Sequence, residues 1–125
     1  MHEIVIKPRI SEVNASGHVS NTALPVWLEE ARVEFFEESL APTRFTYMLV
    51  NLEQNFRREI FNDTRVQVKT RVKQLGNSSV TLIQEVWQRR SLAVEAQSVV
   101  VYVDNNTGQP TLLPPKMREL LSVKP

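Results

Sequence analysis

The sequence predicts an α+β fold in which a curved antiparallel sheet wraps around one long central helix. Residues 20–40 carry apolar side chains at the three- and four-residue spacing of an amphipathic helix. Residues 64–75 alternate polar and apolar side chains with the two-residue period of a strand, and turn signals and further strands follow. Helices and strands do not alternate as they do in parallel sheets, so the strands are expected to pair antiparallel.

The composition is that of a single globular domain spanning residues 1–125. A chain of 125 residues that is 42% hydrophobic is long enough to bury a core. The absence of cysteine excludes a disulfide framework and a thiolate nucleophile, and it fits a reducing cytoplasm. The net charge of +1 argues against a protein that binds nucleic acid through bulk charge.

The N-terminal residues MHEIVIKP contain no long apolar run, so we expect neither a signal peptide nor a membrane span. The expected location is therefore the cytoplasm, with neither nucleic acid nor a membrane as a partner. A first short strand is predicted over residues 3–7, because this run of strand-favouring residues stops at Pro8. A polar loop follows over residues 11–20.

The long helix has clear start and end signals. Ser20 or Asn21 can accept a hydrogen bond from the first free backbone N–H groups, and Pro25 lies early enough in the helix to be tolerated. The helix should end before Pro42, because the residue that precedes a proline is pushed out of the α region. Its apolar stripe consists of Leu24, Trp27, Leu28, Ala31 and Phe35, and its solvated face carries Glu30, Glu34, Glu37 and Glu38.

Four strands are predicted after the helix, over residues 45–56, 64–75, 79–88 and 92–103. The turns between them are expected at Asn62-Asp63, Gly76-Asn77 and Arg90-Ser91. In the second of these strands one face is apolar, and the other is wet and basic because of Lys69, Arg71 and Lys73. A short terminal helix over residues 115–121 closes the chain, with Pro115 in its first turn.

The end of the last strand, residues 99–103, is apolar on both faces, which is typical of a strand that is buried on both faces. The helix can cover only one of the two faces. A bare apolar face beside a free sheet edge would favour aggregation. We therefore expect a homodimer or a homotetramer.

Two motifs resemble the signature of a known family. They are Arg9-x-Ser11-Glu12-x-Asn14-x-x-Gly17-His18-Val19-x-Asn21 and, directly after it, Trp27-Leu28-Glu29-x-Ala31-Arg32. Together they resemble the hotdog-fold acyl-CoA thioesterases of the 4-hydroxybenzoyl-CoA thioesterase type. The resemblance continues through residues 56–58 before Asp63, the hairpin over residues 75–79, and the segments 103–108 and 113–114, so it covers nearly the whole chain.

This resemblance implies an enzyme that hydrolyses acyl-CoA to the free acid and coenzyme A, at a site on the subunit interface and without a cofactor or metal. The chain departs from the family at position 14, where the usual catalytic aspartate is replaced by Asn14. An amide cannot take up a proton or form an acyl intermediate, but it can orient a water or donate a hydrogen bond. Two alternatives therefore stay open: a non-catalytic acyl-thioester-binding protein on the same fold and, ranked last, a hotdog hydratase.

The resemblance also assigns roles to individual residues. The expected catalytic residues are Asn14 and His18, which would position water, the backbone N–H of Asn21, which would polarise the thioester oxygen, and Glu29, from either subunit, as a carboxylate. Glu12 is the other carboxylate near the loop. The expected substrate-binding residues are Gly17, which allows close backbone approach, and three candidates for the coenzyme A phosphates, Arg57, Arg58 and Lys73.

Each of these assignments has a structural alternative. Asn14 is also a residue that forms turns through hydrogen bonds to its own backbone. Glu29 and Arg32 are spaced for an i, i+3 pair on the helix, worth about a few tenths of a kcal/mol. The basic residues 69, 71 and 73 are most simply the wet face of a strand, and the aromatic residues Trp27, Phe35 and Phe36 are expected in the core.

Overall fold

The computed structural model describes residues 1–122, and it confirms the α+β class. Its strands are β1 (His2–Ile6), β2 (Tyr47–Phe56), β3 (Val66–Leu75), β4 (Ser79–Gln88) and β5 (Ser91–Tyr102). Its helices are the short 3₁₀ turns η1 (Ile10–Glu12) and η2 (Asn21–Ala23), the long helix α1 (Leu24–Leu40) and the terminal helix α2 (Pro115–Leu121). None of these helices is long and apolar enough to cross a membrane.

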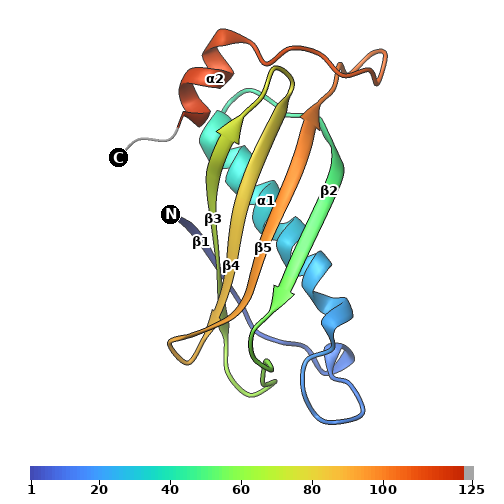
Figure 1. Ribbon diagram of the computed structural model, residues 1–125, viewed down its shortest axis with the longest axis vertical. Helices are drawn as coiled ribbons and strands as arrows, with labels where there is room; N and C mark the ends of the chain where they lie inside the picture. Colours follow the sequence, from blue (N-terminus) through green and yellow to red (C-terminus); the bar gives the residue numbers. More distant parts are fainter. Residues whose placement is uncertain (123–125) are drawn as a thin grey trace.

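The five strands form one antiparallel sheet in the order β1-β3-β4-β5-β2. Helix α1 lies across one face of this sheet, as Figure 1 shows, and α2 lies at one end of it. Strand β5 is therefore an inner strand between β4 and β2, whereas β1 and β2 are the two edges. The predicted arrangement of a sheet around one long helix is confirmed.

The core lies between α1 and the sheet and follows the predicted apolar stripe. Near the start of α1, the fully buried residues Trp27, Leu28 and Ala31 pack against β1, β3, β4 and β5. Near its end, Phe35 and Phe36 pack with residues of β3, β4, β5 and α2. The four glutamates of the predicted solvated face are exposed. The predictions for the helix faces and for the three aromatic residues are confirmed.

Two details differ from the sequence-based expectations. The turn before β5 is formed by Arg89 and Arg90, not by Arg90-Ser91, and both residues have positive φ. A two-residue turn of this kind twists in the same sense as the strands that it joins. In α1, Arg32 does not pair with Glu29 within the described chain; its side chain is buried and its Nη1 donates to the Gln84 side chain at 3.4 Å.

Replacing Arg90 by glycine is expected to stabilise the protein. Arg90 has a φ of 64°, and a residue with a Cβ atom pays about 1–2 kcal/mol for this left-handed conformation. Because part of this gain is offset by the freer glycine backbone in the unfolded chain, Arg90→Gly should raise the free energy of unfolding by about 1 kcal/mol, measured by urea titration. Arg90→Ala is the matched control, and an equal gain in that variant would show that the backbone conformation is not the cause.

Candidate active site

Asn14 folds the loop that precedes α1. Its side-chain oxygen accepts hydrogen bonds from the Ser16 N–H at 3.0 Å, the Ser16 hydroxyl at 2.7 Å and the His18 N–H at 3.2 Å. The Asn14 N–H in turn donates to the His18 carbonyl at 2.8 Å. Gly17 has a φ of 86°, in the left-handed region that favours glycine. The turn-forming role that Asn residues often have is therefore present here.

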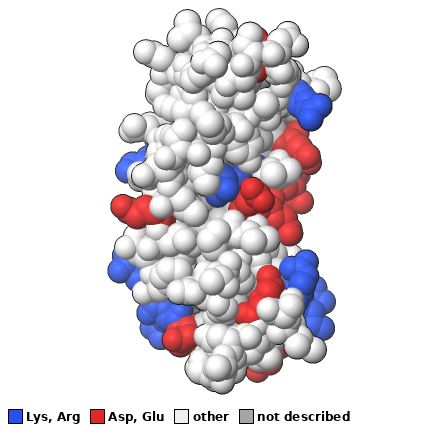
Figure 2. All heavy atoms as spheres, turned by 90° about the vertical axis from the view of Figure 1, so that its right-hand side faces the viewer, with Lys and Arg blue, Asp and Glu red and all other residues white. Residues whose placement is uncertain are grey.

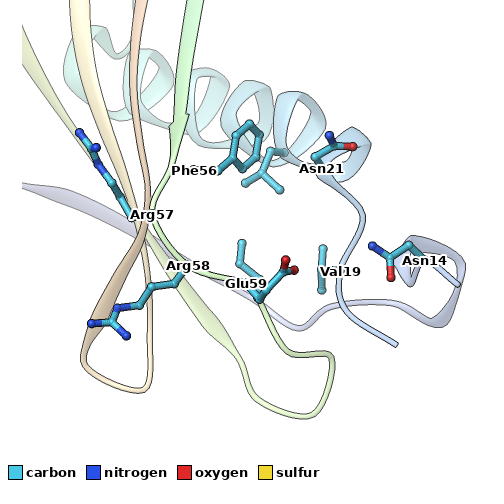
Figure 3. Close-up of a pocket in the computed structure, with 9 residues that line it drawn as sticks. Asn14, Val19, Asn21, Phe56, Arg57, Arg58 and Glu59 are labelled. Atoms are coloured by element: carbon cyan, nitrogen blue, oxygen red, sulfur yellow. The ribbon is translucent and has the colours of Figure 1, made fainter. Parts of the chain in front are cut away.

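These contacts fix which end of the Asn14 amide faces outward. Backbone N–H groups can only donate, so the atom that accepts from Ser16 and His18 has to be the side-chain oxygen. The amide nitrogen makes no hydrogen bond within the described part of the chain, and Figure 3 shows it on the side of Val19. Asn14 therefore presents a hydrogen-bond donor, and not an acceptor, to the cleft described below.

The start of the long helix supplies a second donor. Ser20 caps η2, because its hydroxyl oxygen accepts from the Thr22 N–H at 3.3 Å. The N–H of Asn21, the first residue of η2, has no acceptor among residues 1–122. Free N–H groups at a helix start carry a partial positive charge and attract oxyanions. The Asn21 N–H is thus available to a ligand.

The loop is fastened to the segment that follows β2. His18 and Phe61 form an isolated antiparallel bridge, and the Val19 N–H donates to the Ile60 carbonyl at 2.8 Å. The imidazole packs edge-on against the Phe61 ring, with ring centroids 5.3 Å apart. This pairing brings the Glu59 carboxylate to 3.7 Å from His18 Nδ1. A carboxylate and an imidazole from distant parts of the chain thereby become neighbours.

A cleft of about 580 Å³ lies between this loop, the start of α1 and the end of β2. It is lined by Asn14, Val19, Asn21, Leu24, Phe56, Arg57, Arg58, Glu59 and Ile60. Figure 3 shows the Glu59 carboxylate directed toward Val19 and Asn14, whereas the side chains of Arg57 and Arg58 point away from them. The cleft therefore offers one exposed carboxylate and two neutral donors, with cations near its margin.

The structure brings together most of the residues that the sequence proposed. Asn14, Asn21, Arg57 and Arg58 line the cleft, and His18 lies next to it through its contact with Glu59. Gly17 shapes the loop. Two residues lie elsewhere in the protomer. Glu29 lines a separate hollow beside the start of β2, and Lys73 lies on the outer face of the sheet, where its Nζ donates to Gln97 at 3.0 Å.

Glu12 is held in a structural role. One of its carboxylate oxygens accepts from the Arg9 N–H at 2.8 Å, and the other accepts from the indole N–H of Trp27 at 2.7 Å. Because Trp27 is fully buried in α1, this contact ties the loop to the core. Glu12 therefore positions the loop, and its oxygens do not line the cleft.

Glu59 is the site residue that sequence reasoning missed. Its position gives one signal, because it directly follows Arg57 and Arg58, the predicted coenzyme A contacts. Its proximity to His18 depends on a bridge between two loops that are far apart in the sequence.

One group of described side chains has the spacing of metal ligands. His2 Nε2 lies 3.0 Å from a Glu34 oxygen and 2.6 Å from a Glu38 oxygen, where β1 meets α1. None of these three residues lines the cleft. Their contacts join β1 to the solvated face of α1.

Comparisons with known proteins agree with this architecture. The family model described as the thioesterase-like superfamily matches residues 8–121. The structure of a predicted thioesterase from Bacillus stearothermophilus is 31% identical, with a TM-score of 0.86 over 95% of this chain and 92% of that chain. No curated protein has a matching sequence.

Two further structures share the fold at lower identity. A thioesterase from Thermus thermophilus, complexed with coenzyme A and Zn, is 24% identical, with a TM-score of 0.88 over 97% of both chains. The YbaW probable thioesterase from Escherichia coli is 23% identical, with a TM-score of 0.83 over 97% of this chain and 96% of that chain.

Proposed function

We propose that this chain, which belongs to the thioesterase-like superfamily, is an acyl-CoA thioesterase. Such an enzyme hydrolyses acyl-CoA to the free acid and coenzyme A. Its fold is the hotdog fold, and family membership supports thioester hydrolysis as the general reaction. The main support for the site is the meeting of a carboxylate, an amide donor and a free helix N–H in one cleft, from Glu59, Asn14 and Asn21. The relative that is complexed with coenzyme A supports a coenzyme A thioester as the substrate.

In the proposed mechanism a water attacks the thioester carbonyl carbon, since the cleft offers no cysteine and Asn14 offers no nucleophile. Glu59 takes the proton of this water, with the His18 imidazole beside it. The developing oxyanion is stabilised by the Asn21 N–H and the Asn14 amide N–H. The tetrahedral intermediate then loses the coenzyme A thiolate, which takes up the proton from Glu59, so that the acyl–sulfur bond is replaced by an acyl–oxygen bond.

The test is a steady-state assay of thiol release from a panel of acyl-CoAs that differ in chain length and polarity. We expect the protein to hydrolyse at least one acyl-CoA of the panel. Heat denaturation of the protein should abolish this activity. If no member is hydrolysed while acyl-CoA binding is seen by isothermal titration calorimetry, the proposal fails. The alternative, a non-catalytic acyl-thioester binder, would then hold. One observation favours that alternative: the Asn14 oxygen is fully engaged in the loop.

The proposed site lies at a subunit interface, which the edge strand β2 would form. This strand ends the sheet and exposes the large apolar residues Met48, Leu49, Val50 and Phe56. Figure 2 shows this side of the molecule, most of which is covered by residues other than Lys, Arg, Asp and Glu. A long apolar edge invites pairing with another strand, and a second copy provides a matching one.

Antiparallel pairing of β2 with its own copy has a geometric consequence for the site. The Phe56 end of one strand then lies beside the Tyr47 end of the other. The cleft that includes Phe56 would face the partner's hollow beside Tyr47, which Glu29 also lines. A catalytic contribution of Glu29 from the facing subunit stays a prediction. The role of Lys73 as a contact for the coenzyme A phosphates also stays a prediction. The choice between homodimer and homotetramer also stays a prediction.

The wild-type protein is expected to run as a dimer or larger oligomer in light scattering at micromolar concentration. Met48→Glu combined with Val50→Glu should produce a monomer, because charges on an edge strand oppose pairing. The monomer should also lose activity, since the site would be incomplete. Val5→Glu is the matched control, because Val5 is an exposed residue on the opposite edge strand β1. A monomeric wild type would contradict this assembly.

Arg57 and Arg58 are expected to hold the phosphates of coenzyme A at the margin of the cleft. Their joint replacement by alanine should raise KM about three- to ten-fold with little change in kcat, because exposed ion pairs contribute modestly. The wild-type KM should rise with added salt, and the variant should respond less. Arg65→Ala, which removes an exposed arginine outside the cleft, is the control. A KM that is unchanged by both salt and the double substitution would refute the assignment.

A further inference from the structure

Arg32 carries a buried charge that the described chain does not neutralise. Its side chain is only 2% exposed, and it takes part in no ion pair among residues 1–122. Its Nη1 donates to the side chain of the neutral Gln84 at 3.4 Å, and its Nε has no partner among residues 1–122. Burying a charge without a counter-ion is costly, so such groups are normally paired or bind a ligand.

The surroundings of Arg32 on the sheet side are polar but neutral. Gln84 is itself fully buried, and its amide nitrogen has partners for both of its hydrogens. Its Nε2 donates to the Leu28 carbonyl at 3.0 Å and to the Thr70 hydroxyl at 3.1 Å. These contacts hold the Gln84 oxygen toward Arg32. They orient the guanidinium without offering it a negative charge. The missing counter-ion has to come from the other side of Arg32.

On that other side lies a hollow of about 360 Å³ between the middle of α1 and the start of β2. Apolar residues form much of its lining, among them Val33, Phe45 and Leu49. Its charged lining residues are Arg32, Arg44 and Glu29, which leaves an excess of one positive charge. The Tyr47 phenol also lines it, where burial raises the pKa of that group and the neighbouring Arg32 guanidinium partly offsets the rise.

We propose that this hollow binds a carboxylate at the far end of the acyl group, so that the preferred substrate is an acyl-CoA whose acyl chain ends in a second carboxylate. The Arg32 guanidinium and the Tyr47 hydroxyl donate to the carboxylate, and the apolar wall packs against the methylene groups of the chain. This inference rests on the proposed thioesterase function. It adds the substrate class, which the cleft around Asn14 does not determine.

The path of the acyl group follows from the strand pairing described above. In a two-fold pair of β2 strands the thioester lies in the cleft of one subunit, beside Phe56, and the chain extends toward the Tyr47 end of the partner's strand. The hollow of one subunit therefore completes the site of the other. Each composite site would hold one thioester and one carboxylate.

A phosphate of coenzyme A is the other anion that could reach an arginine. Arg32 lies on the acyl side of the proposed path, whereas Arg57 and Arg58 lie near the margin of the cleft, where the nucleotide would leave it. A planar carboxylate also matches the forked geometry of a guanidinium such as that of Arg32. The experiment separates the two anions directly.

The test compares hexanoyl-CoA with adipoyl-CoA, which have the same chain length and differ only in the terminal carboxylate. For the wild type we expect kcat/KM to be about ten- to hundred-fold higher for adipoyl-CoA, the range for hydrogen bonds to charged groups. In Arg32→Met this ratio should fall to about one or below it. Because both substrates carry the same coenzyme A, an Arg32 contact to a phosphate would lower both values together and leave the ratio unchanged. That result would overturn the proposal.

Two further variants keep the test informative if Arg32→Met does not fold. Arg32→Lys keeps the charge but loses the forked geometry, and Tyr47→Phe removes one donor, so each should lower the ratio by a smaller factor. Arg65→Met is the control for the loss of an arginine, and its ratio should equal that of the wild type. A wild-type ratio of kcat/KM near one would refute the carboxylate site. Hydrolysis of hexanoyl-CoA would still support the thioesterase function in that case.

A binding measurement separates failure of the inference from failure of the proposed function. Adipate should raise the melting temperature of the wild type more than chloride does at equal ionic strength, and this gain should be absent in Arg32→Met. If adipate stabilises only the wild type but no acyl-CoA is hydrolysed, the carboxylate site stands and the enzymatic function fails. If adipate has no effect and Arg32→Met strengthens or weakens the dimer, the counter-ion of Arg32 is a side chain of the partner, and the ligand site is wrong.

Discussion

Glu59→Gln is expected to lower kcat for acyl-CoA hydrolysis by about two to four orders of magnitude, the usual contribution of a general base. Glutamine keeps the shape of the side chain and removes its ability to take a proton from water. KM should change little, because Glu59 acts on the water and not on the bound coenzyme A. Steady-state kinetics at pH 7, with unfolding curves to confirm equal stability, measure the effect.

Two companion variants identify the carboxylate that acts as base. Glu29→Gln should have a much smaller effect if Glu59 is the base, and a reversal of the two effects would assign the role to Glu29 of the facing subunit. Asn14→Asp in the Glu59→Gln background should recover at least part of the lost activity. One aspartate oxygen can keep the contacts to Ser16 and His18, and the other takes the place of the amide nitrogen at the cleft. No loss in Glu59→Gln would remove Glu59 from the mechanism.

Trp27→Ala is expected to lower the free energy of unfolding by about 3–5 kcal/mol, the range for truncating a large buried aromatic residue. Trp27 is fully buried under the sheet, and its indole N–H also satisfies the Glu12 carboxylate. Removing it leaves a cavity and takes away the hydrogen bond to the Glu12 carboxylate. Denaturant unfolding followed by circular dichroism measures the loss, since the tryptophan signal itself is altered.

The neighbouring residue provides a matched control. Val26 lies on the same helical turn but is 57% exposed, so Val26→Ala should change stability by no more than about 0.5 kcal/mol. Trp27→Phe keeps most of the buried ring and removes only the donor to Glu12. Its loss of unfolding free energy should fall between those of Val26→Ala and Trp27→Ala. Equal losses in Val26→Ala and Trp27→Ala would show that burial is not the cause, since both substitutions raise helix propensity.

Much of the fold could be predicted because its signals are local. Ser20 caps the 3₁₀ turn η2, which leads into α1 at Leu24, and α1 ends at Leu40, before Pro42 as expected. Strand β3 shows the predicted alternation, with Val66, Val68, Thr70 and Val72 buried. The terminal helix begins at Pro115, the residue predicted for its first turn.

The rest of the site depended on contacts between distant segments. Glu59 reaches His18 only because two loops form a bridge, and no local pattern indicates such a bridge. Arg32 falls at the spacing of an ordinary surface pair with Glu29, yet Gln84 on a central strand draws its side chain inward. The direction of a side chain at the border between two helix faces is decided by the partner across the core.

The Asn14 loop has a consequence for how this family can diverge. Its geometry needs one oxygen at the tip of residue 14, and an amide and a carboxylate provide that oxygen equally well. Asparagine and aspartate are separated by a single base change in their codons. A lineage can therefore replace an aspartate that attacks the substrate by an asparagine that only donates a hydrogen bond, and the loop keeps its fold. This exchange requires that a second carboxylate such as Glu59 is already in place.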